Sequence, residues 1–139
     1  MKYAPKKEEL KKYLSLEEAE RTLPAVDGLL RDLQALQKTL TLLESVEIEV
    51  EEEQAQQLSQ LTKFNKTFHK LSSEFYEKLE QLEQLGCMVK DVEQGLVDFV
   101  HRFEGRDVFL CWRLSEENSH YWHERDSEFA GRKKIFNLR

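Results

Sequence analysis

The stretch LSQLTKFNKTFHKLSSEFYEKLEQLEQLG, residues 58–86, decides the fold of this chain. Its apolar residues recur at three- and four-residue steps, a spacing that places side chains on one face of an α-helix. They are Leu58, Leu61, Phe64, Phe68, Leu71, Phe75, Leu79, Leu82 and Leu85. Gly86 follows at the position where a left-handed cap would end the helix. The spacing therefore predicts a long helix that ends at Gly86.

A second helical pattern precedes this one. Ser15 and Glu18 have the spacing of a capping box, in which the hydroxyl and the carboxylate satisfy each other's backbone amides, so we expect a helix to begin at Leu16. The same apolar spacing follows at Leu16, Ala19, Leu23, Val26, Leu30, Leu33, Leu40 and Leu43. Because Pro24 lacks an amide hydrogen and its ring crowds the preceding turn, we expect a kink or restart near Leu23.

An acidic segment, residues 44–53, lies between the two patterns and contains six glutamates. Two long helices joined by one turn must be antiparallel neighbours, which predicts a coiled-coil-like helical hairpin with an acidic tip. The simplest interpretation of the tip is a solvated connection, because runs of like charge usually stay in solvent. The alternative is a prong that faces a partner or binds a cation.

After Gly86 the pattern changes to short segments rich in β-branched and aromatic residues. We predict strands at Cys87–Val92, Leu96–Val100 and Val108–Leu114, with Tyr121–Glu124 as a further extended piece. The fold class is therefore α+β, a long antiparallel helical hairpin followed by a small antiparallel sheet of about three strands. We expect the apolar face of the sheet to lie on the base of the hairpin.

The 139 residues fit a single domain. Its expected parts are a mobile lead-in (residues 1–14), the hairpin (15–86) and a β module with a C-terminal tail (87–139). The net charge of −6 at pH 7 disfavours nucleic-acid binding by bulk electrostatics. No export signal or membrane span is apparent, so we expect a soluble cytoplasmic protein. Cys87 and Cys111 lack metal or disulfide spacing, which predicts reduced thiols that pack as small hydrophobes.

The strand at Val108–Leu114 suggests a polar site. Alternation places Phe109, Cys111 and Arg113 on one face, and an arginine on a packed face needs a carboxylate or an anion. Candidate carboxylates are Asp91, Asp98, Glu124 and Asp126. One interpretation is a buried Arg–Asp pair that pins the sheet. The other is a site for an anionic ligand, whose candidate residues are Arg113, Arg132, Trp112, Trp122 and Asp98.

Metal-capable side chains are densest at His120, His123, Glu124 and Asp126. A step of three residues would bring both histidines onto one face in a helix but would split them in a strand. No cofactor is predicted, and a divalent metal at this run is the alternative. A nucleophilic pair of Cys111 and His123 can also be drawn, although no oxyanion motif accompanies it.

An ordered series of short motifs carries a resemblance to a known family. The motifs are Gly95-Leu96-Val97-Asp98-Phe99, Gly105-Arg106, Leu110-Cys111-Trp112-Arg113-Leu114, Trp122-His123-Glu124 and Phe129-Ala130-Gly131-Arg132. Together with the helix start at residues 15–24, this series resembles domain-of-unknown-function family 2203, uncharacterised small helical proteins of bacteria. The resemblance implies a single domain and no particular activity. Ser115 and Glu128 stand where the family pattern has glycine, so two loops are expected to differ in shape if those glycines serve turns with positive φ.

Three functional hypotheses follow. The first is a non-enzymatic interaction module that forms a homodimer, or binds a protein partner, through its helices, because a lone hairpin leaves one side of its phenylalanines hard to cover. The second is a small metal- or phosphate-dependent enzyme that uses His123, Glu124, Asp126 and Arg113. The third, by analogy of shape with bacterial transcript-cleavage factors, is a hairpin factor of the transcription machinery with an acidic tip.

Overall fold

The computed structural model describes residues 12–51, 58–116, 121–124 and 131–135, with the side chains of 47–51 and 58–59 excepted. The elements are α1 (Leu16–Glu51), α2 (Leu58–Gln84), β1 (Cys87–Asp91), β2 (Leu96–Phe103), β3 (Arg106–Arg113), β4 (Tyr121–Glu124) and β5 (Lys133–Lys134). The pairings between these five strands are antiparallel, and the strands lie in the order β1-β2-β3-β4-β5. The α+β class is thus confirmed, with five strands instead of about three. Strand β5 was missed because two exposed lysines carry no alternating pattern.

Helix α1 begins at the predicted capping box. The backbone amide of Glu18 donates to Oγ of Ser15 at 3.1 Å, and the amide of Ser15 donates to Oε1 of Glu18 at 3.2 Å. The expected restart near Leu23 is wrong, since α1 continues as one helix through Pro24. Proline removes one backbone hydrogen bond, whereas buried Leu23 and Val26 anchor the helix to one core on both sides of it.

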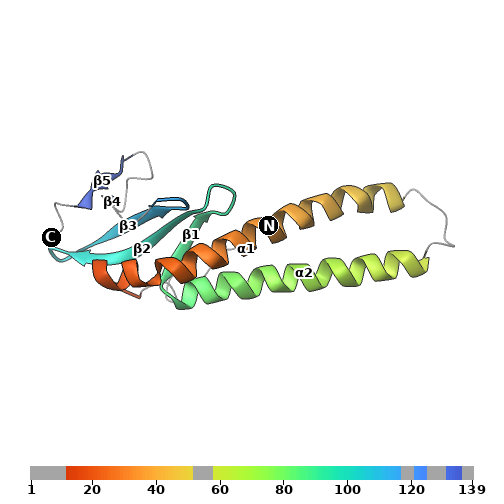
Figure 1. The fold of residues 1–139 in the computed structure, drawn as a ribbon, viewed down its shortest axis with the longest axis horizontal. Helices are drawn as coiled ribbons and strands as arrows, with labels where there is room; N and C mark the ends of the chain where they lie inside the picture. The colour runs from red at the N-terminus through yellow and green to blue at the C-terminus, as the bar shows by residue number, and fades with distance from the viewer. Residues whose placement is uncertain (1–11, 52–57, 117–120, 125–130, 136–139) are drawn as a thin grey trace.

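Helix α1 extends to Glu51, so the first part of the acidic segment is helical. The rest of the expected tip, residues 52 and 53, lies outside the described residues. The two helices are antiparallel neighbours (Figure 1), and Nζ of Lys78 lies 3.3 Å from Oδ2 of Asp32 across them. The role of the acidic tip stays a prediction.

The sheet covers only one end of the hairpin, and the rest of both helices projects beyond it (Figure 1). On α1, Nε2 of Gln34 donates to the carbonyls of Val92 and Glu93 at the sheet end of the molecule. We call residues 36–51 and 58–74 the arm. Among its described side chains, Leu40 is buried, but the other seam residues are only half-buried: Leu36, Leu43, Leu61, Phe64, Phe68 and Leu71.

One face of the sheet completes the core with the base of the hairpin. The buried residues on this face are Cys87, Val97, Phe99, Val108, Leu110, Trp112 and Trp122. They form one cluster with the buried α1 and α2 residues Ala19, Leu23, Val26, Leu30, Leu33, Leu79 and Leu82. Packing of sheet on helix accordingly forms the core of the protein.

Part of the expected lead-in belongs to this structure. Tyr13 forms a parallel bridge with Val100, and the amide of Leu14 donates to the carbonyl of Val100 at 2.8 Å. Leu14 is buried, and its own carbonyl contacts Nδ1 of His101 at 2.9 Å. Residues 12–14 are therefore fixed on the sheet, and residues 1–11 lie outside the described part.

The loop after β3 contains Ser115, one of the two residues that depart from the family pattern. Ser115 has a φ of +87°, in the left-handed region that favours glycine. The serine thus occupies the backbone conformation that a glycine would take, so the expected change of loop shape is not seen there. Glu128 lies outside the described residues. Within the described residues, no helix has the length and apolar character needed to cross a membrane.

Candidate functional site

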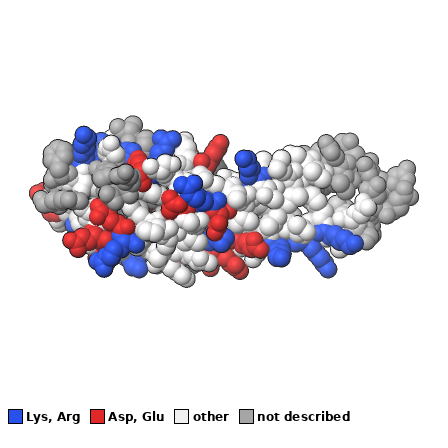
Figure 2. All heavy atoms as spheres, in the orientation of Figure 1, with Lys and Arg blue, Asp and Glu red and all other residues white. Residues whose placement is uncertain are grey.

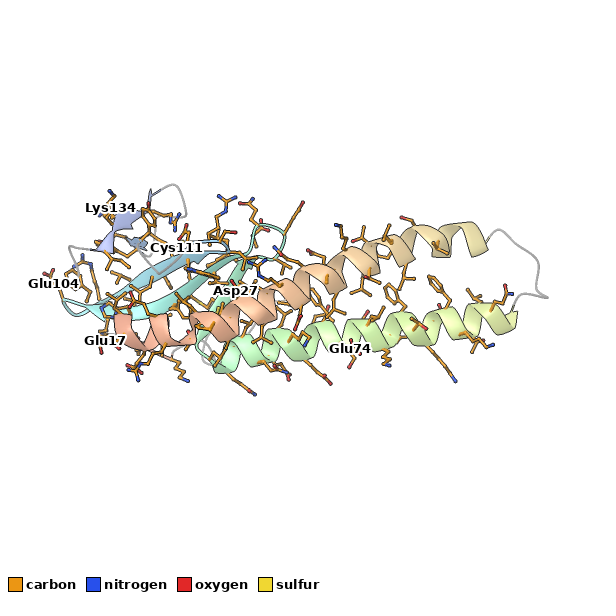
Figure 3. The ribbon with its side chains drawn as sticks, viewed as in Figure 1. Glu17, Asp27, Glu74, Glu104, Cys111 and Lys134 are labelled. Atoms are coloured by element: carbon orange, nitrogen blue, oxygen red, sulfur yellow. The ribbon has the colours of Figure 1, made fainter. Side chains whose placement is uncertain are left out.

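Strands β2, β3 and β4 bring three polar side chains together on the face of the sheet opposite to the helices. Asp98 pairs with Cys111 across β2 and β3, and Phe109 pairs with His123 across β3 and β4. The exposed fractions are 2% for Asp98, 1% for Cys111 and 5% for His123, so the group is buried. We call these three residues the polar cluster. Figure 3 labels Cys111 at the sheet end of the molecule, remote from the arm.

The imidazole of His123 is held at both nitrogens. Nε2 lies 2.9 Å from Oδ2 of Asp98, and Nδ1 lies 2.9 Å from the carbonyl oxygen of Glu124. Because a carbonyl can only accept, Nδ1 carries a hydrogen, and a further proton lies between Nε2 and Oδ2. The ring also stacks on Phe109, with centroids 5.2 Å apart. A ring so engaged is poorly placed to act as a general base.

Cys111 lies in surroundings that favour its thiol form. Burial raises the pKa of Cys111 to about 12, and the negative charge of Asp98 adds to the effect. A nucleophilic cysteine needs the opposite shift, toward the thiolate. The structure therefore brings Cys111 and His123 together, as the nucleophilic pair requires. The raised pKa of the thiol nevertheless opposes formation of the thiolate that would attack a substrate.

One carboxylate oxygen of Asp98 lacks a conventional hydrogen-bond donor among the described residues. This oxygen, Oδ1, is buried. The neighbouring thiol of Cys111 is only a weak donor. Since buried carboxylate oxygens are normally paired, this atom is the feature of the polar cluster that most needs a ligand.

The candidate residues for an anion site are dispersed. Arg113 is exposed at the end of β3, so the buried Arg–Asp pair expected from the sequence does not form. Arg132 donates to both carboxylate oxygens of Glu116 at 2.9 and 3.0 Å and lies over the ring of Tyr121. Its charge is thus already balanced by a carboxylate.

The two tryptophans serve the core. Trp112 and Trp122 are buried on the face toward the helices, which is the face opposite to Asp98. The indole Nε1 of Trp112 donates to the carbonyl of Glu116 at 3.1 Å. Neither ring is available to stack on a ligand at the polar cluster.

The predicted metal run is divided by the strand. His123 and Glu124 are successive residues of β4, so their side chains point to opposite faces of the sheet. Glu124 instead accepts from Arg106 at 2.9 and 3.1 Å. His120 and Asp126 lie outside the described residues. Asp91, a candidate partner of Arg113, accepts from the amide of Gln94 in the turn after β1.

The sequence suggests Cys111 and His123 as a pair and Asp98 as a candidate residue, but it does not bring the three together. Asp98 and Cys111 are neighbours only through the register of β2 and β3, and His123 joins them through the register of β3 and β4. The ligand-capable atoms of the three residues lie within 4.8 Å of one another. The usable signal was alternation, which places Cys111 on the face away from the core.

These features define an α+β protein with a projecting helical arm and a small sheet that holds a buried histidine, aspartate and cysteine. Residues 12–135 match the family model described as an uncharacterized conserved protein, DUF2203, and the chain belongs to that family. No curated protein and no solved structure gave a match.

Proposed function

We propose that the protein is an interaction module that forms an antiparallel homodimer through its arm. The observation that carries the proposal is the exposure of apolar side chains on α1, where Leu42 is 66% and Val46 is 44% exposed. In Figure 2 the described surface of the arm is mainly white, the colour of residues other than Lys, Arg, Asp and Glu, with some blue groups along its lower edge. Exposed apolar surface of this kind usually marks an interface.

The exposed residues of α1 form a regular stripe. Its members follow one another at steps of four and three residues, all of them exposed: Gly28, Asp32, Ala35, Thr39, Leu42 and Val46. We call this set the α1 stripe. Its positions are symmetric about Gln37, so an antiparallel second copy would place Ala35 opposite Thr39 and Gly28 opposite Val46. A surface that matches itself under a twofold axis suits a homodimer.

Gly28 supports close approach of another helix at the stripe. A glycine in a helix interior destabilises it by about 1 kcal/mol relative to alanine. A Cβ at position 28 would meet nothing within 4 Å in the protein itself. The fold of one chain therefore does not require this glycine, whereas a second backbone packed against the stripe would benefit from it.

The charges of α2 favour the same arrangement. Its distal half carries Lys63, Lys66 and Lys70, and the half nearer the sheet carries Glu74, Glu77, Glu80 and Glu83, together with Lys78, which pairs with Asp32. The three lysines of the distal half and the first three glutamates mirror each other about residue 72 to within one residue. Two antiparallel copies of α2 therefore bring opposite charges together, whereas parallel copies would bring like charges together.

The two centres of symmetry lie at the same level of the hairpin. The ion pair between Lys78 and Asp32 fixes the alignment of the helices. Five residues further toward the tip, Gln37 stands beside residue 73, next to the centre of the charge pattern on α2. One twofold axis can therefore relate both helices at once. The resulting four-helix bundle would cover the half-buried side chains of the arm.

The test is the oligomeric state in solution, measured by sedimentation equilibrium over a range of concentrations. The wild-type protein is expected to be a dimer that dissociates on dilution. Leu42→Glu places a charge in the stripe and should give a monomer. Ser45→Glu makes the same charge change at an exposed α1 position off the stripe, and should remain dimeric. A wild-type monomer at every concentration, or equal behaviour of both variants, would refute the proposal.

A charge exchange tests the antiparallel geometry. Lys66→Glu should weaken the dimer several-fold, and adding Glu77→Lys should restore it. Within one helix these residues are eleven positions apart, about 16 Å, so they do not pair in the same chain. Restoration therefore requires a second, antiparallel copy. Failure of the second substitution to restore the dimer would exclude this geometry while leaving other dimers open to the first test.

A further inference from the structure

We propose that the polar cluster is a zinc site in which Asp98, Cys111 and His123 supply three ligands. This inference is independent of dimer formation, because the cluster lies on the face of the sheet opposite to the helices, whereas the α1 stripe lies on the exposed surface of α1. The residue types fit the metal, since thiolate sulfur, imidazole nitrogen and carboxylate oxygen are all zinc ligands. No metal-ligand spacing in the sequence predicts the site, because its three residues come from three different strands.

The distances between the donor atoms are compatible with one ion. Around a tetrahedral zinc, ligand atoms stand about 3.3–3.8 Å apart, as bond lengths of about 2.0–2.3 Å require. Nε2 of His123 and Oδ2 of Asp98 are 2.9 Å apart, and all three donor atoms lie within 4.8 Å of one another. Binding would separate the nitrogen and oxygen slightly and draw the sulfur inward by up to about 1 Å. Side-chain rotation can supply shifts of this size while the strands stay paired.

The surroundings orient the ligands as they do in known metal sites. The Nδ1 hydrogen of His123 points to the carbonyl oxygen of Glu124 at 2.9 Å, which leaves Nε2 as the atom turned toward the cluster. A metal-bound histidine usually donates its other ring hydrogen to such an oxygen. Phe109 stacks on the ring and fixes its plane.

Asp98 provides an independent observation. Its Oδ1 is buried and unpartnered among the described residues, on a side chain that is only 2% exposed. A carboxylate removed from water needs a cation or hydrogen-bond donors on both oxygens. A zinc ion bound to Oδ2, with a zinc-bound water in reach of Oδ1, would meet that need.

The charge of the cluster balances with zinc. Without metal, the thiol and the His–Asp pair with its shared proton are neutral together. With zinc, the two positive charges of the ion are balanced by one carboxylate and one thiolate, and the thiol proton and the shared proton are released. The buried group is thus neutral in both states, which limits the free energy of burying the ion.

Three protein ligands leave a fourth position for a water molecule or a ligand atom. Structural zinc sites usually have four protein ligands, whereas sites that bind or activate another molecule have three. Within the described residues the cluster offers three, so the inference is a zinc site with one exchangeable position.

Cobalt(II) is the probe, because it binds in place of zinc and its thiolate bond gives a charge-transfer absorption in the near ultraviolet. The metal-stripped full-length protein is titrated with cobalt(II) and then with zinc. We expect one cobalt per chain, a thiolate band, d–d absorption of tetrahedral strength, and displacement by one equivalent of zinc.

Two buried cysteines provide a matched control. Cys111→Ala should abolish the thiolate band, whereas Cys87→Ala, on the opposite face of the sheet, should retain it. Circular dichroism identifies a variant that has failed to fold. If a variant does not fold, the titration of the wild-type protein still tests the zinc site. The absence of a thiolate band in the folded wild-type protein, or a band that depends on Cys87, would overturn the inference.

Discussion

Nε2 of His123 on β4 lies 2.9 Å from Oδ2 of Asp98 on β2, so this buried pair reaches across the intervening strand β3. It joins two strands that share no backbone hydrogen bonds. On β3, Cys111 is the register partner of Asp98, and Phe109 is the register partner of His123. The pair therefore adds a side-chain link between β2 and β4, where the backbone ladder provides only nearest-neighbour links.

Breaking this pair should destabilise the protein strongly. Removing one partner of a buried pair typically costs about 3–5 kcal/mol, because the other partner is left buried and unsatisfied. We expect His123→Ala to lower the free energy of unfolding in urea by an amount in that range. Arg106→Ala, which breaks a partly exposed ion pair with Glu124, should cost about 1 kcal/mol or less. Equal effects of the two substitutions would contradict the structural role of His123.

The two thiols should be inert in the folded protein. Burial raises the pKa of Cys111 to about 12 and that of Cys87 further still. Reaction with a thiol reagent at pH 8 should therefore be as slow as unfolding, and should become fast in denaturant. Rapid labelling of either cysteine under native conditions would count against the described packing.

The same shifts predict lower stability at high pH. A raised folded-state pKa contributes stability that is fully present below the unfolded value and is lost as the pH rises toward the folded value. The unfolded pKa of cysteine is about 8.5, so the free energy of unfolding should fall above about pH 9. Cys111→Ala should reduce that slope, and an unchanged slope would exclude the thiol as its cause.

The capping box gives a prediction at low pH. Hydrogen bonds with Ser15 hold the pKa of Glu18 below its ordinary value. This stabilisation is present above the unfolded pKa and is lost as the pH falls through the folded pKa. Ser15→Ala should therefore lower the free energy of unfolding at neutral pH. Thermal unfolding below about pH 4 should show a smaller difference, and a constant difference would mean that Glu18 is not involved.

Alanine substitutions at two glycines with positive φ should distinguish the cost of backbone strain from the cost of a steric clash. Gly95 and Gly105 have φ values of +66° and +76°. A Cβ at Gly95 would lie 2.6 Å from Cβ of Leu114, whereas a Cβ at Gly105 would meet nothing within 4 Å. Alanine at Gly105 should cost about 1–2 kcal/mol of strain, and alanine at Gly95 should cost about 1–3 kcal/mol more. Equal costs in chemical denaturation would refute the close contact with Leu114.

Ser115 offers a stabilising substitution. Its φ of +87° strains a residue with a side chain but not a glycine. Ser115→Gly should raise the free energy of unfolding by about 1 kcal/mol, less the entropy that glycine adds to the unfolded chain. Loss of stability in this variant would show that the hydroxyl contributes more than the strain.

Much of the fold could be predicted because its signals are local. The start of α1 was fixed by Ser15 and Glu18, and the seam of α2 by apolar residues at helical spacing. The restart near Leu23 was wrong because tertiary packing on both sides outweighs one lost hydrogen bond. Periodicity also could not show that α1 continues into the acidic segment.

The candidate site was less predictable because it depends on register. Alternation assigned Phe109, Cys111 and Arg113 to one face, but it could not show which strand would lie opposite. Arg113 falls at the exposed end of β3, whereas Asp98 meets His123 in the middle of the sheet. A local run of metal-capable residues at 120–126 was a weaker guide than the pairing of β2, β3 and β4.

Both edges of the sheet are formed by short strands, β1 and β5. At one edge, β1 pairs with residues 96–99 of β2. The next residue of β2, Val100, pairs with Tyr13 and Leu14 instead. On the other side, β5 is two exposed lysines long. Short edge strands that carry lysine resist the edge-to-edge strand pairing by which sheet proteins aggregate. The short edges of the β module therefore disfavour amyloid-like growth by the addition of strands.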